Sequence, residues 1–482
     1  MSITNILRIE NDYSFFLSED LQTKHEIWDR LRFRDRNYFH NRAYKMRKWD
    51  GYIQFFALET GKFLTGLLPE VNAVLQHFKV DFIVEDNRKK TSFLFESVDQ
   101  NFLNQWLPAK TLNGDPMKPV VLYDYQVELI NQVLKHRRGI IYAPTSSGKT
   151  NIMLGILKSI PPGTPTLVLQ NRVTLAQQNF DEIKNWGFDN VGSLWGGSVN
   201  PNVITVASVQ SVSKMEKALP KIKVLIVDEI HDMMSTLPKA VYRRLKACDV
   251  RVAVSATPFK FGGKDNVQKF HVRGFFGPIL KVKSTTTGVL TTAELQERGI
   301  LSASNCIFYP IREPMIPHDI YIDAITRGIA ESYYFHRVVT RLAKNQTGRT
   351  LILVDRVAHG DALHNLLPGS LWVQGKDTQA TRKGVVKQLQ KDEHCVAIAT
   401  QQIFNTGINV HVHNLINAAS GQADHMIIQR MGRGLRTAND KEILNYYDFL
   451  FKINDYLEDH SNKRIKILTE EGHKVEVKEI DF

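Results

Sequence analysis

The stretch APTSSGKT (143–150) follows the apolar run Gly139 to Tyr142 and precedes NIMLGILKSI (151–160), whose spacing is helical. The sequence therefore predicts a strand, a tight loop and a helix in direct succession. Small residues let the backbone N–H groups of such a loop turn onto phosphate oxygens, and the helix N-terminus adds its dipole. We expect a nucleotide-phosphate loop formed by Thr145, Ser146, Ser147, Gly148, Lys149 and Thr150. The loop alone does not say what the nucleotide energy drives.

Two side chains of this loop have specific chemistry. Lys149 can reach the β and γ phosphates, and the hydroxyl of Thr150 can ligate Mg²⁺. Ala143 stands where the usual pattern has its first glycine, a position that needs only a small side chain. The loop thus predicts ATP and Mg²⁺ as cofactors.

A pair of carboxylates follows in VLIVDEIH (224–231). Four apolar residues place Asp228 at the carboxyl end of a buried strand, where ligands bind in open α/β sheets. We expect Asp228 to hold Mg²⁺ through water, and Glu229 to orient and deprotonate the attacking water. Adjacent acids are also compatible with a solvated strand end. Their position 79 residues after Lys149, beyond intervening strands, favours a single hydrolytic site.

Apolar runs alternate with amphipathic helical patterns along most of the chain, which predicts an α/β fold with parallel sheets covered on both faces. The runs of the first set are 138–144, 166–171, 203–208, 224–229 and 250–257. Those of the second set are 349–355, 370–375, 395–400 and 413–419. With LNGDPMKP (112–119) as a linker, the predicted domains are residues 1–110, 111–285 and 286–482. Residues 464–480 are predicted to form a hairpin around EEGH at a domain edge.

Composition narrows the class of protein. The chain has 482 residues, too many for one core, and a formal net charge of +12 with a pI of about 9.3. Such a charge favours a polyanionic partner, although a merely soluble basic protein fits it equally well. Three scattered cysteines make a disulfide framework or a zinc site improbable and fit a reducing cytosol. The N-terminal residues have no signal-peptide pattern, and no apolar run is long enough to cross a bilayer.

These motifs, taken in order, resemble superfamily 2 helicases over roughly residues 120–440. Gln126 in LYDYQVEL matches the glutamine that reads adenine, and APTSSGKT and DEIH match motifs I and II. SAT (255–257) matches motif III, IFNTGINV (403–410) resembles motif V, and QRMGRGLR (429–436) matches motif VI. The spelling DEIH departs from DEAD, which disfavours a dedicated RNA helicase of that branch.

The resemblance implies two RecA-like domains in tandem, with ATP between them, and roles for further residues. Arg433 and Arg436 would act as arginine fingers, which are worth about 10³–10⁵ in rate in other systems. The resemblance implies that motif II, III and VI residues relay the nucleotide state: His231, Ser255, Thr257 and Gln429. It places Gly407 near the nucleotide and Thr406 near both nucleotide and nucleic acid, and it offers Arg172 as a backbone contact.

The leading segment is expected to contact nucleic acid. Eight of the cations in residues 1–110 fall between Arg30 and Lys48, against one acid, Asp35. Basic side chains can neutralise phosphates, and interleaved rings can stack on unpaired bases. The alternative is a hairpin with a solvated basic face and an aromatic core. We expect contacts from Arg32, Arg34, Arg42, Arg47 and Trp49, with a turn at Asp50–Gly51 between strands.

NRAYKMRKWDGYIQFFALETGKFLTGLLP (41–69) also resembles the leading domain of phage UvsW-type helicases. That resemblance implies an ATP-driven motor on branched DNA, meaning forks, Holliday junctions and R-loops, in phage recombination, replication and repair. It further implies the host bacterial cytoplasm, no membrane, and an RNA–DNA hybrid as one partner; a monomer is also expected. The alternatives are an RNA-directed helicase, the translocating subunit of a restriction system, and a non-catalytic nucleic-acid switch.

Overall fold

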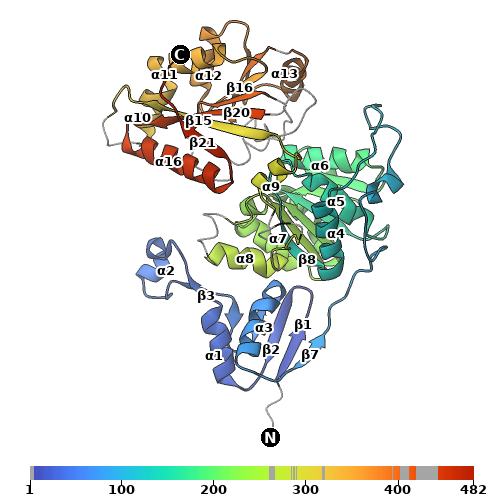
Figure 1. Cartoon of the computed structure of the whole chain (residues 1–482). Coiled ribbons are helices and arrows are strands. Elements are labelled where there is room, and N and C mark those ends of the chain that lie inside the picture. The colour runs from blue at the N-terminus through green and yellow to red at the C-terminus, as the bar shows by residue number, and fades with distance from the viewer. Residues whose placement is uncertain are drawn as a thin grey trace. The chain divides into compact units, whose positions relative to one another are not determined.

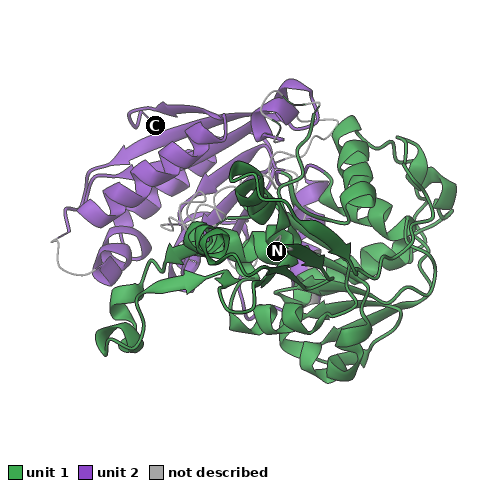
Figure 2. Ribbon diagram, turned by 90° about the horizontal axis from the view of Figure 1, so that it is seen from below, with its two compact units in different colours: residues 1–143, 148–289 green, residues 144–147, 290–482 purple. Residues whose placement is uncertain are grey.

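The computed structural model describes residues 5–259, 266–283, 285, 288, 290–316, 321–392, 394–401, 412–419 and 443–481. Within these ranges the chain forms one five-stranded, two seven-stranded and one two-stranded sheet (Figure 1), which confirms the predicted α/β class. Contacts divide the chain into two compact units (Figure 2). The first comprises Met1–Ala143 and Gly148–Val289, and the second comprises Pro144–Ser147 and Leu290–Phe482.

The first unit opens with a small α+β domain on a five-stranded sheet of order β5-β6-β2-β1-β7. Strand β1 pairs antiparallel with β2 and parallel with β7. Alternate residues of β1 and β2 point into a core that the helices complete, including Leu7, Phe16, Ile27 and Val71. The elements are β1 (Ile6–Ile9), β2 (Tyr13–Leu17), α1 (Leu21–Arg30), β5 (Phe56–Ala57), β6 (Lys62–Leu64), α3 (Leu68–His77) and β7 (Ile83–Asp86).

A basic arm, defined here as residues 35–51, leaves this domain between β3 (Arg32–Arg34) and β4 (Tyr52–Gln54), which pair antiparallel. The arm contains the short helix α2 (Arg42–Lys45). The predicted turn is present, because Gly51 has φ +85° and the Asp50 carboxylate accepts from the Tyr52 amide at 3.0 Å. It joins α2 to β4, however, and not one strand directly to the next as predicted. The polar residues between the strands favour local turns and short helices over a tight hairpin.

Buried polar contacts fasten the small domain to the rest of the first unit. Asp249, 2% exposed, accepts hydrogen bonds from the Thr91 amide and hydroxyl and pairs with Arg137 at 2.7 Å. Arg138 donates to the backbone carbonyls of Asn11 and Cys248. Because these groups are buried, leaving one unpaired would carry a desolvation cost, so they specify one mutual orientation.

The larger part of the first unit is a seven-stranded sheet of order β11-β10-β12-β9-β13-β14-β8. All its pairs are parallel except β10 with β11, and every run of the first predicted set is a strand here. The strands are β8 (Arg138–Tyr142), β9 (Thr166–Gln170), β10 (Val191–Trp195), β11 (Ser198–Asn200), β12 (Ile204–Ser208), β13 (Val224–Asp228) and β14 (Val250–Ser255). The helices include α4 (Asp124–His136), α5 (Lys149–Lys158), α6 (Val173–Asn185), α7 (Thr236–Arg244) and α8 (Asn266–Phe276).

The second unit holds a seven-stranded sheet of order β17-β18-β16-β19-β20-β15-β21, and all its pairs are parallel. The second predicted set of strands is confirmed within it. The strands are β15 (Ala303–Ile311), β16 (Thr350–Val354), β17 (Leu371–Val373), β18 (Val396–Thr400), β19 (Asn414–Asn417), β20 (Ile443–Phe451) and β21 (Lys474–Val477). The helices include α9 (Thr292–Glu297), α11 (Tyr333–Lys344), α12 (Val357–Leu366), α13 (Gln379–Lys391) and α16 (Asp455–Glu470).

The predicted C-terminal hairpin over 464–480 is wrong. Residues up to Glu470 belong to α16, and β21 adds parallel to β15 at the sheet edge. The helix is fixed by Arg464, fully buried, whose guanidinium binds the equally buried carboxylate of Asp448 at 2.8 Å. Removing one partner of a buried pair leaves an uncompensated charge, so this contact holds the segment as a helix. Gly472, at φ +86°, then turns the chain into β21.

The described ranges contain neither a membrane-spanning helix nor a disulfide bond. No helix there is long and apolar enough to cross a membrane. The three cysteines, Cys248, Cys306 and Cys395, are free thiols and all are buried, which agrees with the expectation of no disulfide framework.

A buried histidine makes the second unit sensitive to acid. Burial lowers the pKa of His359 to about 3, and its Nε2 has no hydrogen-bond partner among the described residues. The ring stacks on that of His336 at 5.0 Å between centroids. Because the folded pKa lies below the unfolded value, the unfolded state takes up the proton first as pH falls below about 6.5. Stability from this residue is complete above that pH and is lost as pH falls towards 3.

We therefore expect the free energy of unfolding of the second unit to fall by up to about 1.4 kcal/mol for each pH unit below 6.5, because of His359. Urea titrations of the wild type, His359→Gln and the control His136→Gln at several pH values measure this slope. The slope should flatten only in His359→Gln, since His136 is exposed. Equal slopes in all three proteins would refute the assignment.

Candidate nucleotide site and nucleic-acid surface

The nucleotide site is built where β8, β14 and β13 end together. In the parallel ladders Asp228 lies opposite Val254, and Ser255 lies opposite Tyr142. The Ala143 amide then donates to the Ser255 carbonyl at 3.1 Å, so the start of the phosphate loop is tied to the end of β14. The carboxyl ends of parallel strands share one sheet edge, which brings the two predicted motifs together.

The phosphate loop has the backbone conformation that anion binding needs. Ser146 has φ +68° and Gly148 has φ +76°, so amides of neighbouring residues can converge as in an anion nest. Gly148 is the N-cap of α5, and Lys149 is the first residue of that helix. The hydroxyl of Thr145 is buried and has no hydrogen-bond partner among the described residues. An orphaned donor inside such a cradle fits a nucleotide phosphate.

Lys149 is held beside the predicted catalytic acid. Its Nζ lies 3.2 Å from Oε1 of Glu229, and both side chains are partly buried, at 16% and 18% exposed. Glu229 follows β13 with φ +51°, a left-handed conformation that is strained for this residue type. The strained backbone marks a position held by its surroundings, as is common at functional sites.

The predicted coupling residues form a short hydrogen-bonded chain behind this pair. Oε2 of Glu229 accepts from the Ser255 hydroxyl at 3.3 Å, and Nδ1 of His231 lies 3.0 Å from the same hydroxyl. The Thr257 amide donates to Ser255 Oγ at 3.1 Å. His231 and Ser255 are buried. Motifs II and III are thus joined through one serine hydroxyl.

Asp228 is the acidic group at the end of β13. Burial raises the pKa of its carboxyl above the ordinary value, and the neighbouring Glu229 carboxylate raises it further. Its Oδ1 accepts from the Glu229 amide at 2.9 Å, and Oδ2 accepts from Gln170 at 3.4 Å. A partly buried carboxylate with a raised pKa gains stability from a bound cation. The described residues hold no group of three or more metal-ligating side chains, and Mg²⁺ beside a nucleotide is typically held by only one or two carboxylates together with phosphates.

Gln126 lies on α4 and packs against the phosphate loop. It is 1% exposed, and its amide nitrogen donates to the Gly148 carbonyl at 3.4 Å. Its amide oxygen accepts from the Tyr123 amide at 3.0 Å. Glycine is favoured at position 148 by its φ of +76°, and a Cβ there would also displace the Gln126 amide, which it would meet at 2.3 Å. In this structure Gln126 braces the loop, and its role in reading adenine stays a prediction.

The chain is similar to two protein families and to two characterised proteins. Residues 119–260 match the family described as Type III restriction enzyme, res subunit, and residues 334–438 match the Helicase conserved C-terminal domain. The chain is 22% identical over 459 residues to the ATP-dependent DNA helicase uvsW of Enterobacteria phage T4, covering 89% of this chain and 87% of that protein. It is 31% identical over 166 residues to the DNA 3'-5' translocase XPB2 of Sulfurisphaera tokodaii, covering 34% and 36%.

The chain is a superfamily 2 helicase. Its enzyme class is accordingly a nucleic-acid-dependent ATPase, and the two seven-stranded parallel sheets are its RecA-like domains. A solved fragment assigned to the HsdR subunit of a type I restriction enzyme from Vibrio vulnificus YJ016 has the same fold. It has a TM-score of 0.54 at 18% identity, covering 74% of this chain and 67% of that one.

Several predicted residues of this helicase lie outside the described residues. They are the motif V residues Thr406 and Gly407 and the motif VI residues Gln429, Arg433 and Arg436. Their roles stay predictions. Thr150 is the second residue of α5, beside Lys149, and its role as a Mg²⁺ ligand likewise stays a prediction.

The arginines at the base of the arm are stacked on rings. The Arg32 guanidinium lies 4.2 Å from the centroid of the Trp28 ring and 4.4 Å from that of Tyr52, and Arg34 lies 4.6 Å from that of Tyr38. Trp49 donates from its indole to the Tyr52 carbonyl at 2.7 Å. These contacts agree with the alternative prediction of an aromatic core, because the rings and two of the arginines pack on one another. Contact with nucleic acid stays a prediction.

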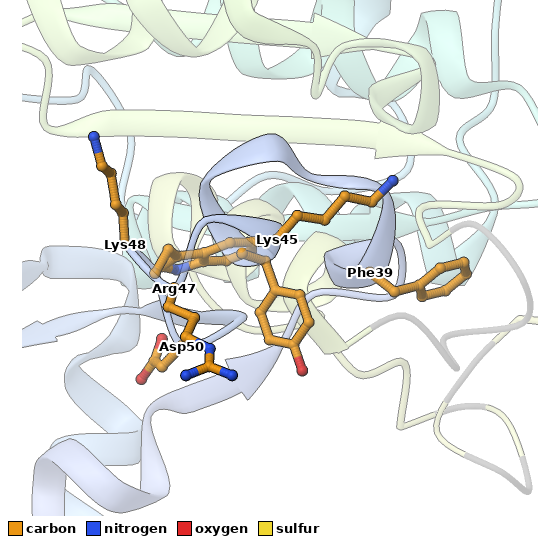
Figure 3. Close-up of a pocket in the computed structure, with 7 residues that line it drawn as sticks. Phe39, Lys45, Arg47, Lys48 and Asp50 are labelled. Atoms are coloured by element: carbon orange, nitrogen blue, oxygen red, sulfur yellow. The ribbon is translucent and has the colours of Figure 1, made fainter.

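The tip of the arm carries the free basic groups. Arg42 and Arg47 are exposed, as are Lys45 and Lys48, and the backbone of Arg47 has φ +55°. A pocket of about 640 Å³ opens here (Figure 3), lined by Phe39, Tyr44, Lys45, Arg47, Lys48, Trp49 and Asp50. Rings and unpaired cations around one hollow suit a phosphate and an adjacent base. Arg172 is exposed at the N-cap of α6, away from this group in sequence.

Sequence reasoning missed Gln170. This buried residue ends β9, and its amide orients the Asp228 carboxylate. A glutamine at the end of an otherwise apolar run, TLVLQ, is the signal that marks it, because a polar group buried there needs a partner.

Replacing Lys149 by alanine should reduce ATP hydrolysis to the level of a protein-free blank. The variant loses the cation that meets the β and γ phosphates and that pairs with Glu229. DNA binding should change little. Steady-state phosphate release with excess DNA measures the effect, and Lys135→Ala, an exposed lysine on α4, is the control. Hydrolysis at the wild-type rate in Lys149→Ala would refute the site.

Proposed function

We propose that this helicase is an ATP-driven DNA motor that unwinds forked DNA and branch-migrates Holliday junctions and R-loops. The observation that carries the ATPase half is the Lys149–Glu229 contact beside the partly buried Asp228, at the end of three parallel strands. The basic arm supports the DNA half, together with the relative named an ATP-dependent DNA helicase. We further propose ATP with Mg²⁺ as cofactor, and a role in phage recombination, replication and repair within the host cytoplasm.

The residues of the site divide the chemistry between them. Lys149 and the loop amides offset the phosphate charge, while Thr150 and Asp228 would hold Mg²⁺, which would neutralise charge on the transferring group. Glu229 is placed to orient the attacking water and take its proton. For this it has to exchange its contact with Lys149 for one with water. Ser255 and His231 contact the other Glu229 oxygen at 3.3 and 3.4 Å, so they help to hold the carboxylate in place.

Motion would follow from the arrangement of motifs on two domains. Arg433 and Arg436 are proposed as arginine fingers, and Gln429 as the residue that senses the nucleotide together with His231. If these groups come from the second RecA-like domain, hydrolysis needs the two domains to close, and product release lets them open. Thr406, Gly407 and Arg172 are proposed to hold the nucleic-acid backbone during this cycle. Contacts of this kind are mainly to phosphate, so sequence specificity should be low.

The arm would recognise DNA near a branch point. Its exposed cations can bind the phosphates of one strand, and the pocket lined by Phe39 and Trp49 suits an unpaired base. Unpaired bases are found next to forks and junctions and not in continuous duplex. A monomer suffices for this geometry, because the arm and the nucleotide site belong to one chain.

Two other substrates define the alternatives. A restriction-system translocase is favoured by the match of residues 119–260 to the res subunit family. It predicts ATPase stimulation by long linear duplex, without a preference for forks. The alternative of an RNA-directed helicase predicts that RNA strands stimulate the ATPase. The ATPase motifs do not distinguish this enzyme from a DNA helicase, because both kinds share them.

Replacing Arg42 and Arg47 by glutamine should weaken binding to forked and four-way junction DNA. It should also reduce the salt slope of binding, d log K/d log[salt], by about two, because each phosphate contact contributes about 0.9. Fluorescence anisotropy across a salt series without ATP measures both. Arg32 and Arg34 stay in place because they stack on Trp28, Tyr38 and Tyr52.

The control is the double variant Lys214→Gln/Lys217→Gln, which removes the same charge from exposed positions of the same unit. If both double variants bind junctions with the wild-type affinity and slope, the arm is a solvated surface. Binding that weakens equally in both would show a general effect of net charge.

A further inference from the structure

Helix α11 of the second unit exposes only aromatic and basic side chains. Its seven other residues are buried in the core of that unit, among them Phe335, Val339 and Leu342. The exposed positions are Tyr333, Tyr334, Arg337, Arg341 and Lys344. Spacings of four, four and three residues align Tyr333, Arg337, Arg341 and Lys344 in one stripe. Figure 1 shows α11 beside α12, and no residue assigned to the nucleotide site lies on it.

The cations of this stripe lack the acidic partners that several other surface cations of the unit have. Within the described part of the chain, Arg337, Arg341 and Lys344 form no ion pair. By contrast Lys463, Lys466 and Lys474 each lie within 4 Å of a glutamate or aspartate, at 2.5, 3.8 and 2.8 Å. The positive charge of Arg337, Arg341 and Lys344 is therefore not offset by an ion pair within the described residues.

A hollow with an orphaned polar group lies within the stripe. The cavity measures about 630 Å³ and is lined by Tyr333, Tyr334, Arg337, Val338, Thr340, Arg341, Lys344, Leu366 and Ile480. The Thr340 hydroxyl is buried, the residue being 7% exposed, and it has no hydrogen-bond partner among the described residues. Buried hydroxyls are normally bonded, so an orphan that lines a basic cavity indicates a ligand atom that accepts from it.

We propose that this stripe, Tyr333 to Lys344, is a second binding site for single-stranded nucleic acid, separate from the motor domains' own track. Arg337, Arg341 and Lys344 span about 10 Å along the helix, at 1.5 Å per residue, which matches about three phosphates of one strand. The Thr340 hydroxyl donates to a phosphate oxygen. Tyr333, 65% exposed, and Tyr334, 42% exposed, present ring faces for bases.

The exposed tyrosines favour a nucleic acid over an acidic protein. Stacking of bases on aromatic rings beside a basic groove is the usual way to bind single strands without sequence preference. Arg337 lies 5.9 Å from the Tyr333 ring, so cation and ring form one platform. Such a site would hold a displaced single strand after the strand leaves the motor domains. The proposal does not depend on whether branched DNA is the preferred substrate.

The test uses the full chain with Arg337→Gln/Arg341→Gln/Lys344→Gln, without ATP. Binding of a fluorescein-labelled oligothymidylate should weaken about tenfold at moderate salt, and the salt slope should fall by about two, at about 0.7 per single-strand phosphate. Tyr333→Ala/Tyr334→Ala should weaken binding and leave the slope unchanged. Lys463→Gln/Lys466→Gln/Lys474→Gln, with the same charge loss from paired lysines, is the control and should bind as wild type.

A second measurement does not depend on affinity. An oligonucleotide with 5-bromouracil, irradiated with the wild-type protein, should crosslink to the tryptic peptide 328–337, which contains both tyrosines. The proposal fails if the α11 and control triple variants bind alike and the peptide carries no crosslink. It also fails if polyglutamate displaces the oligonucleotide and the tyrosine variant binds normally, since that result identifies an acidic protein partner. ATPase at saturating DNA should be unchanged in the α11 variants, which separates this site from the engine.

Discussion

The parallel register of β8, β14 and β13 is the constraint on which the nucleotide site depends. It sets the ends of three strands at one level, so that Ala143, Ser255 and Asp228 emerge from the same sheet edge. The backbone ladders hold that register, and the Ala143 amide, which donates to the Ser255 carbonyl, carries it into the phosphate loop. The contact between Lys149 and Glu229 is a consequence of it, since 80 residues of sequence separate the two.

Much of this arrangement is legible in the sequence. Continuous apolar runs predicted the parallel strands, and the phosphate loop and DEIH predicted which strand ends meet. Long, strongly patterned elements are well determined by local sequence because both faces of each strand are buried. The two positive φ angles in the loop likewise follow from its small residues. The motifs did not predict which neighbouring side chains hydrogen-bond to the site. Examples are Gln170, which donates to Asp228, and Gln126, which donates to the Gly148 carbonyl.

The wrong C-terminal hairpin shows how distant contacts override a local pattern. The alternation in RIKILTEEGHKVEV suggested a hairpin, but the buried Arg464 pairs with Asp448 on β20 and fixes a helix. The basic segment from Arg30 to Lys48 left two readings open, a nucleic-acid surface and a hairpin with an aromatic core. The structure stacks Arg32 and Arg34 on the rings of Trp28, Tyr38 and Tyr52, and contact with nucleic acid stays a prediction. The α11 stripe was visible in the sequence as regularly spaced cations. The cavity beside it, and the buried Thr340 hydroxyl that has no hydrogen-bond partner among the described residues, separate it from an ordinary solvated face.

Branched DNA is proposed to stimulate ATP hydrolysis by this helicase more than other nucleic acids do. The most direct test is steady-state ATPase with equal concentrations of single strand, duplex, forked DNA, four-way junction and an RNA strand, with Lys149→Ala as the blank. The account predicts the strongest stimulation by fork and junction DNA, and none in the blank. Stimulation by RNA alone, or by linear duplex without a preference for branches, would contradict it.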